Sequence, residues 1–234
     1  MTDYNFFDHD TYARSRPKED FWGQIKRTVR GEPADENQIK FITKAITNGL
    51  KLERNDNIID FCCGNGALSS RLKNSVSKLK GIDNSEYLIS IAKEFFEESP
   101  DISFMHSEII DFLNSSTPTE ASKYSKSLCY GSFSYLEQTI IDNILDQFNL
   151  KFKAISRFYI GNIPDRSRAD VFFKDSIPQN ADLASCKSVI GKWWTKSEIR
   201  ALSEKYNWEA TIIDMPEAFY ASAYRFDVIL SRDV

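Results

Sequence analysis

The 234-residue sequence has few of the residues that build metal centres or disulfide frameworks. It contains two histidines, His9 and His106, and four cysteines that form no C-x-x-C pair. Because zinc sites are built mainly from Cys and His at such spacings, the sequence predicts no metal site. We expect all four cysteines to be reduced and structural, and Cys62 and Cys63 to be small packing residues and not nucleophiles. The four cysteines are Cys62, Cys63, Cys129 and Cys186.

Long apolar runs and an excess of positive charge are also missing. No segment approaches the roughly 18 apolar residues of a membrane span, and the polar first twenty residues lack the apolar core of a signal peptide. We therefore expect a cytoplasmic protein that makes no membrane contact. The formal charge of -4 at pH 7 gives no global attraction to nucleic-acid phosphates, although a local basic patch stays open.

What is present is an alternation of predicted strands and helices. Strands are expected at 57–62, 77–83, 102–108, 127–133 and 151–163, and helices at 36–50, 67–73, 86–98 and 136–148. Residues 111–125 have the composition of a polar, turn-rich connection. Near the end of the chain, a helix capped by Thr195 or Ser197 runs to Tyr206, and strands follow at 208–215 and 223–231.

This order predicts an α/β fold with one doubly wound, mostly parallel seven-stranded sheet. Helices cover both faces, and the last two strands form an antiparallel edge hairpin. Residues 1–35 are expected to form an N-terminal arm or lid before the main domain, 36–234. The main domain carries an insertion at about 164–192, where no clear period appears.

A glycine loop follows the first predicted strand, where residues 58–72 are IIDFCCGNGALSSRL. A structural turn needs one glycine, so Gly64 and Gly66 together indicate a backbone that lies against a ligand. In open parallel sheets, ligands bind at the carboxyl ends of the strands, usually beside the first strand. A dinucleotide fingerprint would need a third glycine, where this chain has Ser69, and Asp60 would repel a pyrophosphate. An acid here suits a ligand with a cation or an amine.

These residues resemble the first motif of the class I S-adenosylmethionine-dependent methyltransferases: two apolar residues, Asp or Glu, then x-G-x-G-x-G. Asp60, Gly64 and Gly66 match, and Cys62 stands where the family most often has its first glycine, which slightly tightens the space there. The resemblance covers about residues 36–160 by motif order and the remainder by strand pattern. It implies a Rossmann-like methyltransferase fold and S-adenosylmethionine as cofactor.

The resemblance also assigns roles to residues after the later strands. Asp83 falls where a carboxylate accepts hydrogen bonds from the ribose hydroxyls, and Glu108 falls where an acid meets the adenine amine. Tyr130 falls beside the methionine portion, where a cation–π contact with the sulfonium is worth about 0.5–2 kcal/mol. The remaining cofactor candidates are Tyr12, Arg14, Asn65, Asn84, Ser107 and Ile109. The competing interpretations are a helix cap for Asp83, a surface residue for Glu108 and core packing for Tyr130.

Methyl transfer from a sulfonium is a direct displacement, so alignment of acceptor, methyl group and sulfur matters more than a base. The sequence assigns no catalytic residue, and the candidates are His106, Tyr130 and Glu137. Six basic residues lie between positions 14 and 30 with aromatic residues among them, which suits an anionic small molecule; a solvated helix face is the other interpretation. The substrate-binding candidates are Trp22, Arg27, Ser132 and Asn162.

The arm and residues 192–202 resemble methyltransferases of bacterial surface-polysaccharide gene sets. We therefore expect O-methylation of a sugar, or of a phosphorylated or nucleotide-linked metabolite. The alternatives are an RNA or protein methyltransferase, a catalytically silent S-adenosylmethionine-binding module and, last, a nicotinamide-dependent oxidoreductase. The sequence leaves the oligomeric state open.

Overall fold

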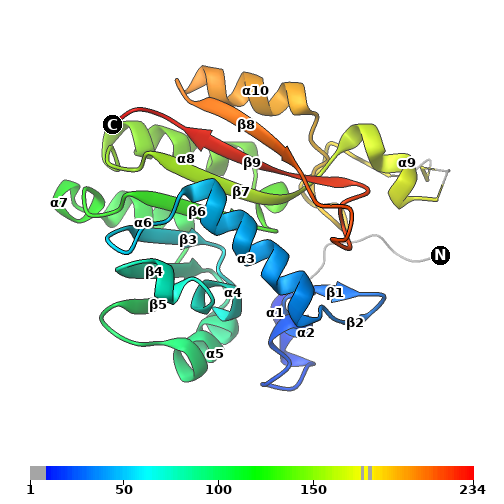
Figure 1. The fold of residues 1–234 in the computed structure, drawn as a ribbon, viewed down its shortest axis with the longest axis horizontal. Helices are drawn as coiled ribbons and strands as arrows, with labels where there is room; N and C mark the ends of the chain where they lie inside the picture. The colour runs from blue at the N-terminus through cyan, green and yellow to red at the C-terminus, as the bar shows by residue number, and fades with distance from the viewer. Residues whose placement is uncertain (1–8, 175–176, 179–180) are drawn as a thin grey trace.

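A computed structural model describes residues 9–174, 177–178 and 181–234 (Figure 1). Residues 1–8 of the predicted arm and residues 175–176 and 179–180 of the predicted insertion lie outside the described residues. In the described part of the chain, no helix has the length and apolar character needed to cross a membrane.

The centre of the fold is a seven-stranded sheet with the strand order β5-β4-β3-β6-β7-β9-β8. The strands are β3 (Asn57–Phe61), β4 (Lys78–Asp83), β5 (Ile102–His106), β6 (Lys126–Tyr130), β7 (Arg157–Pro164), β8 (Glu209–Asp214) and β9 (Arg225–Ser231). All pairings from β5 to β7 are parallel, and β9 pairs antiparallel with both β7 and β8. The predicted doubly wound sheet and its C-terminal hairpin are confirmed, with β9 inside the sheet and β8 at its edge.

Helices cover both faces of this sheet, as predicted. One buried cluster joins the sheet to α6 (Ile109–Ser115), α8 (Gln138–Leu150) and α10 (Lys196–Lys205), and α10 lies beside β8 (Figure 1). The other cluster joins it to α3 (Glu36–Leu50), α4 (Ala67–Ser70) and α5 (Glu86–Phe96). Side chains at the predicted start positions cap three of the helices: Asp35 caps α3, Ser85 caps α5 and Thr195 caps α10.

Two sequence-based expectations are wrong at the level of single elements. Residues 111–125 were expected to form a connection, but they belong largely to α6 and to α7 (Pro118–Ala121). The polar composition of this segment obscures a short amphipathic helix, in which Ile109, Phe112 and Leu113 are buried. A capping box between Thr117 and Glu120 starts the second helix. The helix expected at 67–73 ends at Ser70, and a 3₁₀ turn, η1 (Lys73–Ser75), follows.

The described part of the arm contains four short elements. They are α1 (His9–Arg14), α2 (Phe21–Gln24), β1 (Thr28–Val29) and β2 (Glu32–Pro33), and β1 and β2 form an antiparallel pair. α1 contacts α5, and the arm lies beside the first turn of α3 (Figure 1). After β7 the chain forms the short elements η3 (Arg166–Arg168) and α9 (Ala169–Phe172); η2 (Phe133–Tyr135) precedes α8.

Candidate functional site

The glycine loop after β3 adopts backbone angles that favour glycine at three positions. Gly64 and Gly66 have φ of 58° and 75°, and Cys62, at the family's first glycine position, has φ of 57°. A residue with a side chain pays about 1–2 kcal/mol in this left-handed region. The sequence predicted that Cys62 would tighten the space in the loop, and the structure adds a cost in backbone conformation.

Replacement of Cys62 tests this cost. We expect Cys62→Gly to change the free energy of unfolding by less than about 1 kcal/mol, because relief of the backbone offsets lost packing. Cys62→Val should lower it by about 2 kcal/mol, since β-branched residues avoid positive φ. Urea unfolding of both variants, with Cys186→Val as the control, measures the difference. An equal loss in Cys62→Gly and Cys62→Val would contradict the explanation.

The cysteines themselves differ in burial, and Cys62 and Cys186 are half-buried. All four are free, and Cys63 and Cys129 are buried. A hydrogen bond with Cys129, together with burial, raises the pKa of the Cys62 thiol well above its ordinary value. A thiol with a raised pKa is a weak nucleophile, which agrees with the predicted packing role.

Both glycines of the loop lie against protein atoms. A Cβ atom at Gly66 would lie 2.7 Å from the ring of Phe104, and one at Gly64 would lie 2.9 Å from Cγ2 of Ile25. The sequence was interpreted as a bare backbone facing a ligand. In the structure, Gly66 permits close packing on β5, and Gly64 permits close packing of the arm.

The arm is hydrogen-bonded to this loop. Asn65 is fully buried, and its amide nitrogen donates to the carbonyl oxygen of Phe21 and to Oε1 of Gln24, both at 2.8 Å. Ser85 Oγ, in the cap of α5, donates to Asp10 of α1 at 2.5 Å. The arm therefore covers the carboxyl end of β3 and contacts the start of α5.

Asn65→Ala removes two of the hydrogen bonds that hold the arm. Since each buried hydrogen bond contributes about 0.5–1.5 kcal/mol, we expect amide exchange within residues 9–35 to quicken by about tenfold or more while the sheet keeps its protection. Hydrogen-exchange mass spectrometry measures this change. Asn57→Ala is the matched control, because its side-chain amide bonds Lys123 at the other end of β3. Unchanged exchange in the arm would show that these bonds do not hold it.

Asp83 ends β4 beside the loop. Its Oδ2 accepts from the backbone N–H of Gly64 at 2.8 Å, and its Oδ1 accepts from the N–H of Ser85 at 2.9 Å. Burial raises the pKa of the Asp83 carboxyl, and these two hydrogen bonds oppose the rise. The side chain is only half-buried, so further lone pairs stay available to a ligand.

The other candidates after β4 and β5 lie close to Asp83. Asn84 donates to Glu108 Oε1 at 3.2 Å, and His106 Nε2 lies 3.1 Å from the carbonyl oxygen of Asn84. Asn84, His106 and Glu108 are exposed. The hydroxyl of Ser107 donates to the backbone oxygen of Glu108, and Ile109 is buried.

Asp60 lies underneath the loop. It is 2% exposed, and its carboxylate accepts from the hydroxyl of Ser69 at 2.5 Å. Burial raises the pKa of Asp60 to about 7, against the hydrogen bond from Ser69 and the charge of Arg27. A side chain in this position supports the loop from below.

A second group of candidates lies at the ends of β6 and β7. Tyr130 is 5% exposed, and its ring lies against Gly161 on one side, while the Arg27 guanidinium stands 4.7 Å from the ring centroid. Trp22 lies 6.0 Å from the same guanidinium. The structure thus brings Trp22, Arg27 and Tyr130 together, and Tyr130 is also a core residue.

Asn162 lies next to this group of residues, at a β-bulge in β7. The β7–β9 register shifts between Ile160 and Ile163, and Asn162 takes φ of 65°. Its backbone N–H donates to the buried Asp227 at 2.7 Å. Such bulges re-aim side chains beside functional sites. Sequence reasoning missed Arg225, which donates to the backbone oxygen of Asn162 from the start of β9.

Other predicted residues lie elsewhere. Arg14 is exposed, pairs with Asp10 at 2.6 Å and stands over the ring of Tyr87 in α5. Tyr12 lies under the ammonium of Lys26. Glu137 is exposed at the N-cap of α8, and Ser132 is half-buried at the start of η2.

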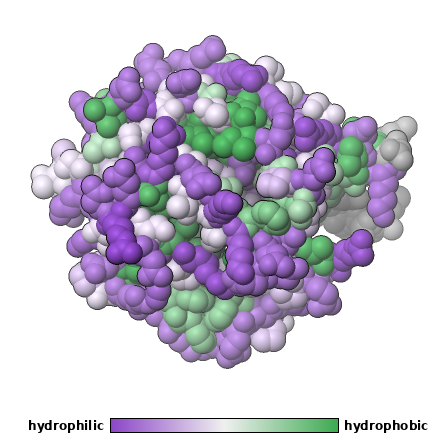
Figure 2. All heavy atoms as spheres, viewed as in Figure 1, coloured by the Kyte–Doolittle hydropathy of each residue, from purple (hydrophilic) through white to green (hydrophobic). Residues whose placement is uncertain are grey.

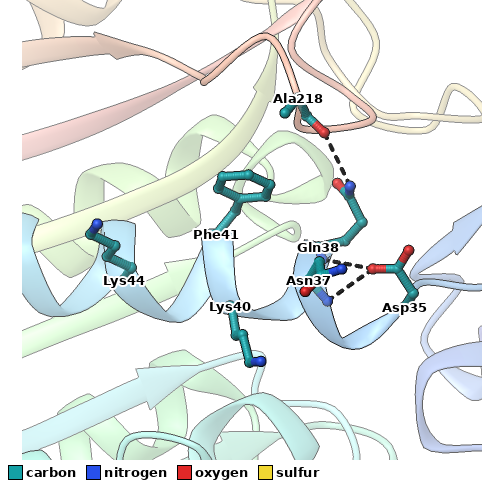
Figure 3. Close-up of a pocket in the computed structure, with 7 residues that line it drawn as sticks. All are labelled: Asp35, Asn37, Gln38, Lys40, Phe41, Lys44 and Ala218. Carbon is teal, nitrogen blue, oxygen red and sulfur yellow. Dashed lines mark hydrogen bonds between the residues drawn. The ribbon is translucent and has the colours of Figure 1, made fainter.

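A separate surface hollow of about 480 Å³ lies along the outer side of α3 (Figure 3). Asp35 and Gln38 in its lining are already hydrogen-bonded, to the first turn of α3 and to Ala218. It shares no residue with the groups at the strand ends. Among the residues that the structure describes, no group of three or more His, Cys, Asp or Glu side chains is placed to hold a metal ion.

The residues at the strand ends fit S-adenosylmethionine in their chemistry. Asp83 and Glu108 carry carboxylates, which are able to accept hydrogen bonds from hydroxyl and amine donors. Arg27 Nη1 is buried and has no hydrogen-bond partner, so this cluster can still take up an anionic or polar oxygen.

Comparisons with known proteins agree with this fit. Residues 58–150 match the family model of a methyltransferase domain. The fold matches the methyltransferase domain of bacterial CtHen1-C with a TM-score of 0.60 and 17% identity, covering 86% of this chain and 100% of that one. It also matches magnesium protoporphyrin IX methyltransferase (ChlM) from Synechocystis PCC 6803 with bound SAH, with a TM-score of 0.58 and 16% identity over 84% and 83% of the two chains.

A TehB-like SAM-dependent methyltransferase from Corynebacterium glutamicum matches with a TM-score of 0.57 and 13% identity, covering 92% of this chain and 98% of that one. No curated protein matches the sequence. At these identities the solved structures establish the fold, and the family model establishes the domain. The strand order and the match over residues 58–150 together show a methyltransferase domain with a Rossmann-like fold, and they support S-adenosylmethionine as its cofactor.

Proposed function

We propose that the methyl acceptor is a polar small molecule, with an oxygen of a sugar or of a phosphorylated or nucleotide-linked metabolite as the methylated atom. The observation that carries this proposal is the pairing of the basic residues in the arm. Arg14 pairs with Asp10 and Arg16 with Asp20, each at 2.6 Å, and Lys18 pairs with Glu94 at 2.8 Å. Lys26 stands over Tyr12, and Arg27 is buried.

Paired cations are poor ligands for a nucleic acid. Binding to DNA or RNA gains its affinity from free Lys and Arg that replace counterions on the phosphates. The arm holds few such groups, and the whole chain is negatively charged. The face shown in Figure 2 is mainly hydrophilic, with its apolar residues in small separate patches, so this face offers no wide apolar surface to a protein substrate.

The bound cofactor supplies an electrophilic methyl group. The chain supplies position and exclusion of water: the arm covers the glycine loop, and Trp22 and Tyr130 lie beside the ends of β6 and β7. Burial raises the pKa of Tyr130 well above its ordinary value, so this phenol stays protonated and is able to donate a hydrogen bond to a ligand. We infer catalysis mainly by orientation of the acceptor, which contributes up to about 7–11 kcal/mol in well-aligned reactions.

We also propose that the chain is divided into an N-terminal arm, 1–35, and a main domain, 36–234, with an insertion at about 164–192. The hydrogen bonds between the arm and the glycine loop support this division. The resemblance to polysaccharide-associated methyltransferases gives the proposed pathway, and the cytoplasm is the proposed location.

Labelled methyl donor distinguishes the candidate acceptors. The purified protein is incubated with methyl-labelled S-adenosylmethionine and a cell extract, which is then divided by ultrafiltration and treated with ribonuclease or protease. We expect the label in the filtrate, in a compound that mass spectrometry shows to be heavier by one methyl group. Label in a ribonuclease-sensitive fraction would favour an RNA acceptor, and protease-sensitive label a protein acceptor. Cofactor binding without any labelled product would identify a silent binding module.

A further inference from the structure

Arg27 carries a buried charge that lies over the rings of Tyr130 and Trp22 and forms no ion pair with a described carboxylate. It is 7% exposed, and its Nη1 has no hydrogen-bond partner among the residues that the structure describes. The nearby acids are engaged elsewhere: Asp60 accepts from Ser69, and Asp227 accepts from Tyr159 and from the Asn162 backbone. A buried, unpaired guanidinium is costly, which indicates a site completed by an anion from outside the chain.

The side-chain amide of Asn162 is a second donor, and it faces the same space beside Gly131 as the Arg27 guanidinium. A Cβ atom at Gly131 would lie 3.4 Å from Arg27 Nη2 and 3.7 Å from Asn162 Nδ2. Gly131 has no side chain, so two N–H groups converge on the space above its Cα. Asn162 Oδ1 is also buried without a partner, and the bulge in β7, held by Asp227, fixes the backbone of this residue.

Arg225 adds a second positive charge beside this space. Its Nη1 donates to the backbone oxygen of Asn162, and its guanidinium stands 5.3 Å from the ring centroid of Tyr224. Arg225 forms no ion pair with any described carboxylate. The charges of Arg27 and Arg225 both act on Tyr130 and on Tyr220, and both oppose the pKa rise that burial causes in these two phenols. The two arginines therefore act on one region, next to aromatic rings.

We propose that Arg27, Arg225 and the side-chain amide of Asn162 bind the anionic group, a carboxylate or a phosphate, of the methyl acceptor. Guanidinium groups bind both anions through paired N–H donors. Tyr220 and Tyr224 beside them are half-buried, and the exposed parts of these rings are able to pack on a ring of the acceptor. This assignment rests on the proposed small-molecule methyltransferase function and narrows the acceptor to a ring compound with a negative charge.

Calorimetry on the full chain saturated with S-adenosylhomocysteine tests the proposal. The probes are glucose, glucose 1-phosphate, glucuronate and inorganic phosphate. Glucose has the ring without a charge and inorganic phosphate has the charge without a ring, while the two charged sugars compare a phosphate with a carboxylate. We expect one of the charged sugars to bind at least about 10-fold more tightly than glucose. Arg225→Gln and Arg27→Gln should each weaken that binding by about 10- to 100-fold, because each removes a charge-assisted contact. Arg225→Lys should restore part of it, and Arg200→Gln, an exposed residue of α10, should have no effect.

Each other result overturns a defined part of the proposal. If S-adenosylhomocysteine binds but neither the charged sugars nor phosphate bind better than glucose, the anion site is wrong and the methyltransferase assignment stands. If Arg27→Gln weakens S-adenosylhomocysteine and leaves the probes unchanged, Arg27 belongs to the cofactor site. If the wild-type protein does not bind S-adenosylhomocysteine, the function on which the proposal rests fails. Thermal unfolding of each variant confirms that it is folded before it is scored.

Discussion

Asp83→Asn is expected to weaken the binding of S-adenosylhomocysteine by about 100-fold or more. The carboxylate of Asp83 already accepts from the backbone N–H groups of Gly64 and Ser85, so it is fixed in orientation at the end of β4. We propose that its remaining lone pairs accept from the two ribose hydroxyls. A hydrogen bond to a charged group contributes about 1.5–3 kcal/mol, and two of them account for the expected change.

The substitution Asp83→Asn also turns one of the two hydrogen bonds to the backbone into a repulsive contact between two donors. An asparagine has a single acceptor oxygen, so its NH₂ group must face either Gly64 N–H or Ser85 N–H, and two donors then oppose each other. The glycine loop should become less ordered while the sheet below it is retained. Calorimetry with S-adenosylhomocysteine measures the affinity, and urea unfolding measures the stability of the same preparation.

Asp101→Asn is the matched control for this experiment. Asp101 is an exposed carboxylate just before β5, and its ion-pair partner Lys78 lies 3.9 Å away at the start of β4. We expect its affinity for S-adenosylhomocysteine to equal that of the wild type. If Asp83→Asn lowers the stability and leaves the affinity unchanged, Asp83 is a cap and loop support only, which is the competing interpretation of the sequence.

Asp83 also shows why the sequence could predict this part of the fold. Parallel strands joined by helical crossovers have all their carboxyl ends at the same end of the sheet. Motifs that follow successive strands are therefore expected to lie close together in space. The strand ends that carry Asp60, Asp83, Glu108 and Tyr130 are therefore predictable from local patterns. The glycine loop could be recognised because its residues are contiguous.

The elements that sequence reasoning missed depend on distant contacts. The buried face of α6 is only a few residues long within a polar segment, so no clear helical period appears. Arg225 reaches the site because β9 inserts between β7 and β8, and no local pattern shows which residue of β9 lies opposite the bulge at Asn162. The contact between Gly64 and Ile25 depends on how the arm folds back, which the arm's composition does not contain.

The stability of the protein is expected to fall as the pH rises from 5 to 8, and Asp60 is the main cause. Burial raises the pKa of Asp60 to about 7 and that of Asp227 to about 6. An aspartate in the unfolded chain has a pKa of about 3.9. Between these values the folded protein keeps the proton and the unfolded chain has lost it, so unfolding releases a proton. Higher pH therefore favours the unfolded state.

The size of the effect follows from the difference in pKa. Over the range from pH 5 to pH 8, Asp60 alone should lower the free energy of unfolding by about 2–3 kcal/mol. Below about pH 3 both states are protonated, and this contribution to the pH dependence disappears. Asp227 adds a smaller loss of the same sign over the lower part of the range, because its folded pKa is lower.

Asp60→Asn isolates this contribution. The amide oxygen can still accept from the hydroxyl of Ser69, and the amide carries no ionisable proton. The variant should therefore lose about 2–3 kcal/mol less than the wild type between pH 5 and pH 8, and retain the loss due to Asp227. Urea unfolding at four pH values across this range measures both curves, with Asp101→Asn as the exposed control. Parallel curves for the wild type and Asp60→Asn would mean that Asp60 is already ionised at pH 5, and that the charge of Arg27 and the hydrogen bond from Ser69 outweigh the effect of burial.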